Sequence, residues 1–294
     1  MRPYQLLPTT SDFEKVRQIG SHIVFLIIPL FFYGCQEDIV TPKGPTRLVV
    51  EGWVTDQVEP FQVSLSETVD FGLSGPLPRV TGAQVSIEDD QGNTYSLDQE
   101  VGPGLYQTSD SFAGVRGRSY RLQIMTPDGE QYASIWELLS PVPPIDTLVS
   151  NLNTFIGGFP TFNVTINIVV FVNYTDPQGK GDFYRWKIYI DGDLLTDPPN
   201  LLLAEDRIED GNQRSLELNF GIVSGLRVRV EQMSLSESAH DFLSLLKSQT
   251  LDLGEPFGVA PAPILGNISN QNDPNQMVLG YFGASSVSSR EISF

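Results

Sequence analysis

The single cysteine of the chain, Cys35, is the residue whose surroundings point most directly to a chemical role. One thiol cannot form an internal disulfide, so its neighbours decide what it does. Basic residues occur early in the chain, the uncharged segment IVFLIIPLFFY follows at residues 23–33, and the small residue Gly34 precedes the cysteine. The apolar segment is shorter than the roughly 20 residues that cross a bilayer. This order of basic, apolar and small residues is typical of a cleaved secretion signal.

The segment FYGC resembles a lipobox, in which signal peptidase II cuts before a cysteine that then receives a diacylglycerol. We therefore expect residues 1–34 to be a lipoprotein signal peptide, cut between Gly34 and Cys35, with the lipid attached to Cys35. Phe32 stands where leucine is usual in this motif. A core cysteine beside an apolar strand is the alternative, but it leaves the order of the upstream residues unexplained. Residues 35–45 contain two prolines and a glycine, which predicts an extended lipidated tether.

Two short motifs bear on where the protein works. Gln36, Glu37 and Asp38 resemble the acidic signal that sends lipoproteins of the Bacteroidota to the outer face of the outer membrane. We expect an outer-membrane lipoprotein at the cell surface; an ordinary polar tether, with the protein on the periplasmic face, is the alternative. Asp146-Thr147-Leu148 resembles the short O-glycosylation site of Bacteroidota envelope proteins, with Thr147 as acceptor, although three residues also recur by chance.

The charge of the chain restricts its partners. The formal net charge is −18 and the pI is near 4.3, so the protein repels the phosphate backbone of nucleic acids. Nucleic-acid binding is therefore excluded, and we interpret the acidity as solubility outside the cytoplasm. The sequence contains no glycine-rich phosphate loop, because its glycines occur in hairpins and proline-rich turns. We expect no cofactor.

Catalysis by a serine or cysteine nucleophile needs a histidine base, and the expected mature chain contains only His240. This residue lies beside Asp241 in a predicted helix, so we interpret it as a packing or surface residue. One histidine without a free cysteine is also too little for a zinc site. A glycosidase pair could be drawn from the 36 acidic residues, but nothing in the sequence marks two that face each other. We predict no catalytic residues and no enzyme activity.

Calcium is the metal that clustered acidic residues favour, because it binds oxygen ligands. Two clusters qualify, Glu88-Asp89-Asp90 and Asp191-Gly192-Asp193. Acidic residues also stabilise tight turns, and neither cluster has the spacing of a calcium loop. We interpret both as hairpin tips and predict no metal site.

Aromatic residues and one long irregular passage are the remaining candidates for binding. Trp53, Trp136 and Trp186 could form a platform for sugars, but aromatic residues that alternate along strands more often belong to the core. Long irregular segments in compact domains are commonly functional, so the passage between the predicted helix and the last strand is the most plausible binding loop. Its candidate residues are Phe257, Pro261, Pro263, Asn267 and Asn270.

In the first half of the chain, the sequence predicts mostly strands. Apolar residues alternate with polar ones at residues 47–56 and 61–69, which predicts half-buried strands. Residues 83–97 and 119–138 each consist of two alternating segments about a turn with Asp and Gly, which predicts β-hairpins. With a short strand at residues 104–108, residues 46–140 predict an immunoglobulin-like or transthyretin-like sandwich.

A proline-rich linker at residues 141–146 is predicted to end this domain, since proline interrupts a hydrogen-bonded ladder. Residues 147–294 then form a second β domain. Its predicted strands are residues 162–176, 183–190, 226–232 and 276–287. The exception is a helix near residues 235–248, where Ser234 and Glu237 match a capping box. The expected fold is all-β, with two tandem antiparallel sandwiches and one helix in the C-terminal domain.

Several separate segments of the expected mature chain resemble, in the same order, a Bacteroidota lipoprotein family catalogued as domain of unknown function 4249 (DUF4249). These segments are LVVEGWVTD, PRVTGAQVSIEDDQGN, LYQT, YRLQIMTPDG, VPPID, PAPILGNISN and LGYFGASS. The resemblance implies an extracellular β-sandwich protein with an accessory role beside a TonB-dependent outer-membrane receptor in nutrient uptake. The family has no established catalytic residues that could be carried over. Two alternatives remain open: a cell-surface hydrolase acting on glycan or peptide, and a structural stalk or adhesin.

The lipid anchor can be tested directly. The Cys35→Ala variant should lose labelling by a fatty-acid probe and leave the membrane fraction, because the thioether that carries the lipid can no longer form. Metabolic labelling followed by membrane fractionation measures both effects. Labelling equal to that of the wild type would contradict the assignment of Cys35.

Overall fold

The computed structural model describes residues 44–70, 75–156, 164–179, 181–196, 200–206, 211–220, 226–251 and 262–293. Cys35, its cleavage site and the acidic signal at residues 36–38 lie outside the described residues, so those assignments stay predictions. In the part of the chain that is described, no helix has the length and apolar character needed to cross a membrane. Pro45–Phe294 forms one compact unit.

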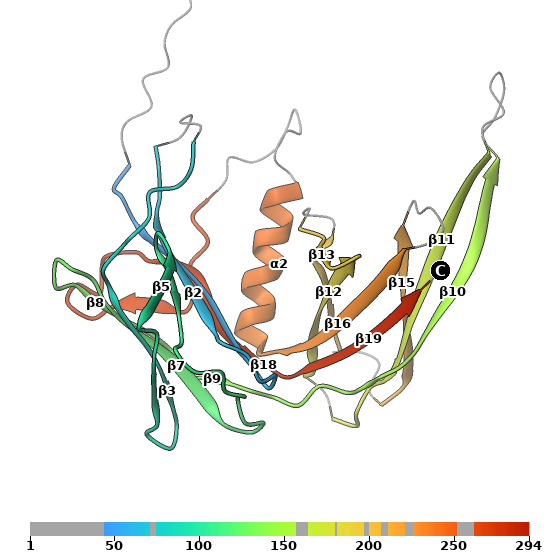
Figure 1. Ribbon diagram of the computed structural model, residues 1–294, viewed down its shortest axis with the longest axis horizontal. Coiled ribbons are helices and arrows are strands. Elements are labelled where there is room, and N and C mark those ends of the chain that lie inside the picture. Colours follow the sequence, from blue (N-terminus) through green and yellow to red (C-terminus); the bar gives the residue numbers. More distant parts are fainter. Residues whose placement is uncertain are drawn as a thin grey trace, which may run out of the picture. The chain divides into compact units, whose positions relative to one another are not determined.

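Two sheets face each other in the first half of this unit (Figure 1). The first has the strand order β18-β1-β2-β6-β5 and the second the order β17-β8-β7-β3-β4, with β9 paired to β7. The bounds are β1 (Leu48–Thr55), β2 (Gln62–Glu67), β3 (Gln84–Asp89), β4 (Thr94–Ser96), β5 (Gln99–Gly102), β6 (Leu105–Gln107), β7 (Ser119–Met125), β8 (Gln131–Ser134), β9 (Glu137–Leu138), β17 (Ile268–Asn270) and β18 (Leu279–Ser285).

The alternation of the sequence produces the core between these sheets. Tyr120, Leu122 and Ile124 are buried on β7 while the residues between them are not, and Val50 and Val54 of β1 are also buried. Each fully buried side chain of this kind contributes about 1.5–3 kcal/mol to folding. These side chains belong to one continuous cluster drawn from both sheets. The prediction of an all-β fold is therefore confirmed, and two facing sheets form its first half.

The second half contains another pair of sheets, with strand orders β10-β11-β15 and β13-β12-β16-β19, and β14 paired to β12. Buried residues from both sheets, Val170, Val172, Trp186, Ile188 and Val230 among them, form its core. The bounds are β10 (Ile145–Ile156), β11 (Val164–Thr175), β12 (Phe183–Ile190), β13 (Asp193–Leu194), β14 (Leu202–Glu205), β15 (Gln213–Phe220), β16 (Arg227–Leu235), β19 (Val287–Ser293) and the helix α2 (Glu237–Leu251).

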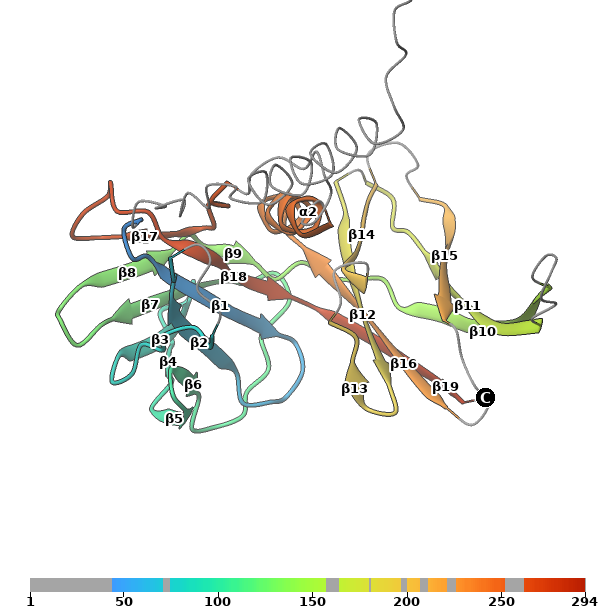
Figure 2. The ribbon, with the colours of Figure 1, turned by 90° about the horizontal axis from the view of Figure 1, so that it is seen from above.

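The last strands of the chain do not stay in the second half. β17 pairs with β8, and β18 runs parallel to β1 with Val50 opposite Gly280. Figure 2 shows β18 and β19 in line, passing from the first pair of sheets to the second. This differs from the expected division, which assigned all of residues 147–294 to a C-terminal domain and expected only antiparallel pairing. Alternation marks a strand in the sequence, but it does not say which sheet the strand joins.

Glycines allow β18 to approach β1 closely. Gly280 has a φ of 89°, and a Cβ at this position would lie 2.0 Å from the backbone oxygen of Val50. Gly283 lies under the ring of Trp53, where a Cβ would come within 2.2 Å of the ring. The parallel pairing therefore depends on glycine at both positions.

The predicted linker and helix each need a correction in detail. Residues 145 and 146, assigned to the linker, are the first residues of β10. α2 is confirmed, but its N-cap is Ser236, whose Oγ accepts the backbone N–H of Ala239 at 3.1 Å. Ser234, which was predicted as the cap, lies within β16, and its hydroxyl donates to the backbone oxygen of Ser140 at 2.6 Å. Both serines fit a capping pattern in the sequence. Because β16 continues to Leu235, only Ser236 lies directly before the first helical residue.

The carboxylate of Glu137 joins elements that are distant in the sequence. The side chain is 1% exposed, and it accepts the hydroxyl protons of Tyr281 at 2.6 Å and of Ser236 at 2.7 Å. Its Oε1 also accepts Asn267 Nδ2 at 3.0 Å and the Ser238 hydroxyl at 3.3 Å. Because Ser236 caps α2, the carboxylate also lies near the positive end of the helix dipole. One buried anion thus holds β9, α2 and β18 together.

The Glu137→Gln variant should lower the free energy of unfolding by about 3 kcal/mol, because an amide N–H₂ would face hydroxyl donors in a buried site. Urea unfolding followed by circular dichroism measures the change. The matched control is Glu217→Gln, which alters an exposed residue of β15 and should stay within about 0.5 kcal/mol of the wild type. Equal stability of the two variants would show that the Glu137 carboxylate is not needed.

Candidate functional site

The largest hollow among those identified is a groove with a cavity volume of about 1030 Å³. Its walls come from β1, β2, β18, β12 and α2, together with residues 262–264. Helix α2 contacts β12, β14 and β16, and it also contacts β18, so the groove is lined by elements of both pairs of sheets (Figure 1). We call it the α2 groove.

Aromatic side chains form the apolar wall of the α2 groove. Trp53 lies on the face of β1 opposite the core, and its ring stacks on that of Tyr281 with centroids 6.1 Å apart. Phe242 of α2 contacts the other side of this cluster, 5.0 Å from Tyr281. Leu246, one helical turn further along α2, is 39% exposed and also lines the groove. The wall is therefore an apolar surface open to a ligand.

Two cations of β12 enter the groove from the opposite side. Tyr184, Trp186 and Ile188 point into the second core, so the alternating residues Arg185 and Lys187 point out of it. Burial lowers the pKa of Arg185, and its Nε has no hydrogen-bond partner. Burial together with the charge of Arg185 also lowers the pKa of Lys187, although carboxylates nearby act in the opposite direction. A half-buried guanidinium that lines a groove can donate charge-assisted hydrogen bonds to an anionic group.

The arrangement suits binding of a ligand with an apolar body and an anionic group. Trp53, Phe242 and Leu246 offer the apolar contact, and Arg185 offers charge-assisted hydrogen bonds. Glu51 and Glu59 also line the groove, so donors on the ligand have acceptors. Among the described residues that line it, none is a histidine or a cysteine.

The predicted binding loop contributes residues 262–264 to the groove, and one of its five candidate residues is among them. Pro263 is exposed and lines it, whereas Phe257 and Pro261 lie outside the described residues. Asn267 instead bonds internally, with Nδ2 donating to Phe282 O at 2.7 Å and to Glu137. Asn270 is 1% exposed, and its Oδ1 accepts the backbone N–H groups of two residues in the following turn. The two asparagines therefore hold the chain in place, which loop composition alone could not distinguish from binding.

The other predicted positions lie away from the groove. Thr147 is exposed on β10, where its Oγ1 accepts Asn173 Nδ2 at 3.0 Å, and its glycosylation stays a prediction. His240 is 8% exposed and packs on Phe183, with ring centroids 5.0 Å apart, which agrees with its interpretation as a packing residue.

Two of the three tryptophans also lie outside the groove. Trp186 is a core residue. Trp136 is 42% exposed and lies under the guanidinium of Arg121, so it is not a core residue.

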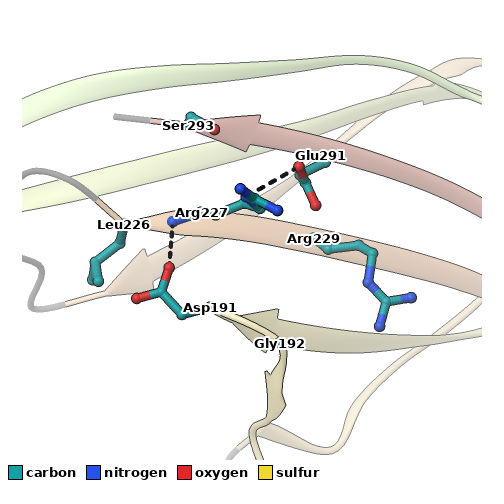
Figure 3. Close-up of a pocket in the computed structure, with 7 residues that line it drawn as sticks. All are labelled: Asp191, Gly192, Leu226, Arg227, Arg229, Glu291 and Ser293. Atoms are coloured by element: carbon teal, nitrogen blue, oxygen red, sulfur yellow. Dashed lines mark hydrogen bonds and ion pairs between the residues drawn. The ribbon is translucent and has the colours of Figure 1, made fainter.

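Both acidic clusters are hairpin tips, as interpreted. Asp89 is buried and accepts the backbone N–H groups of Gln91 and Asn93, at 3.0 and 2.9 Å, within the turn from β3 to β4. Asp191 accepts the backbone N–H of Arg227 at 2.9 Å beside a smaller hollow of about 390 Å³ (Figure 3). In that hollow Arg227 is paired with Glu291 at 3.5 Å, so its charges are already matched.

Two features of the structure were missed by the sequence analysis. Arg185 and Lys187 alternate with aromatic and aliphatic residues in FYRWKIYI, and this alternation was the available signal for cations on an outward face. The second feature is a group of three carboxylates, from Asp176, Asp182 and Asp206, that lie together at one end of the second pair of sheets. Asp206 is too far along the chain from the other two for spacing to reveal the group.

Comparison with known proteins gives the family but no activity. No curated protein matches the chain. The model of the family described as "Domain of unknown function (DUF4249)" matches residues 37–291, which includes both pairs of sheets and the α2 groove. The chain therefore belongs to the DUF4249 family.

Proposed function

We propose that this protein is a non-enzymatic binding module of the bacterial envelope, held in the outer membrane by lipid on Cys35. In this proposal it binds a ligand with an apolar body and an anionic group and presents it to a TonB-dependent receptor in the same membrane. The observation that carries the binding role is the α2 groove, with Trp53 and Phe242 on one side and the side chain of Arg185 on the other.

The chemistry of the groove supports binding at useful strength. Apolar surface removed from water contributes about 25 cal/mol per Å², and a hydrogen bond to a charged donor contributes about 1.5–3 kcal/mol. A lipid anchor adds to this, because it confines the protein and a receptor to the same surface and raises their effective concentration. Moderate affinity in the groove is then enough for transfer of the ligand.

The alternative function, hydrolysis of glycan or peptide, has less support from the groove. His240 lines a different hollow, on the side of α2 that faces β14. The described lining of the α2 groove pairs no nucleophile with a histidine base. A ligand that is bound and released unchanged fits these side chains better than one that is cleaved.

The groove can be probed with 1-anilinonaphthalene-8-sulfonate, which has an apolar body and a sulfonate. Its fluorescence should rise on binding, and Arg185→Ala should weaken the binding about tenfold, because one charge-assisted hydrogen bond of about 1.4 kcal/mol is lost. Trp53→Ala should weaken it through loss of apolar contact. The control is Arg227→Ala, which alters an arginine whose side chain is 65% exposed, outside the groove. Equal affinity of Arg185→Ala and the control would contradict the proposed site.

The partner can be tested by purification of the tagged lipoprotein from membranes in detergent. Mass spectrometry should identify a TonB-dependent β-barrel receptor among the recovered proteins, at a level well above that recovered with an unrelated tagged lipoprotein. The Cys35→Ala variant should recover much less of it, because the variant leaves the membrane. Recovery of no such receptor with the wild-type protein would count against the accessory role while leaving the groove measurement intact.

A further inference from the structure

Three aspartates that are separated in the sequence meet at one end of the second pair of sheets. Asp176 follows β11, Asp182 precedes β12 and Asp206 follows β14. One carboxylate oxygen from each lies within 4.8 Å of those of the other two. The backbone fixes this approach, since the N–H of Asp206 donates to the carbonyl oxygen of Asp182 at 3.0 Å. β11 belongs to one sheet and β12 and β14 to the other, so the three residues join the two sheets.

Two of these carboxylates are buried, and oxygens of both lack a hydrogen-bond donor. Asp176 is 2% exposed and Asp206 is 1% exposed. Both carboxylate oxygens of Asp206 and Oδ2 of Asp176 lack a hydrogen-bond partner of normal geometry. The remaining oxygen of Asp176 accepts the hydroxyl proton of Tyr184 at 2.8 Å. Buried carboxylate oxygens without partners are unfavourable, because the water that would solvate them has been removed.

The local charge is unfavourable as well. Burial raises the pKa of Asp206, and the neighbouring carboxylate of Asp176 raises it further. The nearby N–H of Gly181 and the charge of Arg214 act in the opposite direction, but the pKa of Asp206 stays above its usual value. Three carboxylates that lie this close together, with unsatisfied oxygens on Asp176 and Asp206, need either a shared proton or a cation.

We propose that Asp176, Asp182 and Asp206 bind a calcium ion. Oxygen atoms bound to one Ca²⁺ at about 2.4 Å are at most about 4.8 Å apart, and the three carboxylates meet this limit. The group offers only carboxylate oxygens, which suit a hard cation and do not suit zinc or copper. Magnesium retains most of its water and is held by fewer carboxylates, so it fits a buried group of three less well.

The ion has a structural role in this proposal. It ties the ends of β11, β12 and β14 together at the edge of the second core. Tyr184, which bonds to Asp176, packs in that core against Tyr174 and Trp186, with ring centroids 5.6 and 6.1 Å away. Loss of the ion would therefore loosen the contact between the two sheets at this end.

The first test is the thermal stability of the full-length lipoprotein in detergent, after treatment with a chelator and dialysis. Calcium at about 100 times its Kd should raise Tm by about 5–10 °C, because it binds only the folded state. Asp206→Asn should abolish this rise, whereas the control Asp193→Asn, at an exposed position of β13, should keep it. A wild-type Tm that calcium does not change would overturn the proposal and leave a shared proton as the explanation.

The second test does not depend on the stability of a variant. Terbium, which replaces calcium in such sites, should luminesce when the wild-type protein is excited at the absorption band of its tyrosines and tryptophans, since Tyr184 contacts a ligand residue. Calcium in large excess should displace the terbium, and the same concentration of magnesium should displace much less. Absence of sensitised emission, or equal displacement by the two ions, would overturn the assignment of calcium.

Discussion

A buried carboxylate, that of Glu137, lies where the two halves of the protein meet, and the rest of the structure depends on it. It accepts hydrogen bonds from the cap of α2, from Asn267 and from Tyr281, which belong to three different parts of the chain. A buried carboxylate needs all of these donors. The start of α2 and the position of β18 are therefore fixed only when all these segments have assembled.

The position of the groove follows from the same constraint. Its aromatic wall contains Tyr281, whose hydroxyl is held by Glu137 and whose ring contacts Trp53 and Phe242. A second set of bonds, in which Ser234 and Ser286 both donate to Ser140 O at 2.6 and 2.7 Å, fixes the strands on the other side. The groove is thus lined by rigid elements, so its shape is largely formed before a ligand arrives.

Local chemistry made part of the fold predictable. The hairpins around Gly92 and Gly129 follow from turn residues flanked by alternating strands, and both glycines adopt positive φ. The pairing of β18 with β1 could not be predicted, because the contact is non-local and depends on Gly280 and Gly283. Side chains could be predicted to the same extent. The packing of His240 was predictable from its neighbours in the sequence. The contact between Asp206 and Asp176 was not, because it depends on how three strand ends converge.

The parallel pairing of β1 with β18 has a consequence for folding of the newly made chain. Val50 on β1 pairs with Gly280 on β18, so the first sheet is incomplete until the chain has been synthesised past β18. Closing so long a loop is entropically costly and slows folding. The same strand order that unites the two halves therefore delays folding until both halves are present.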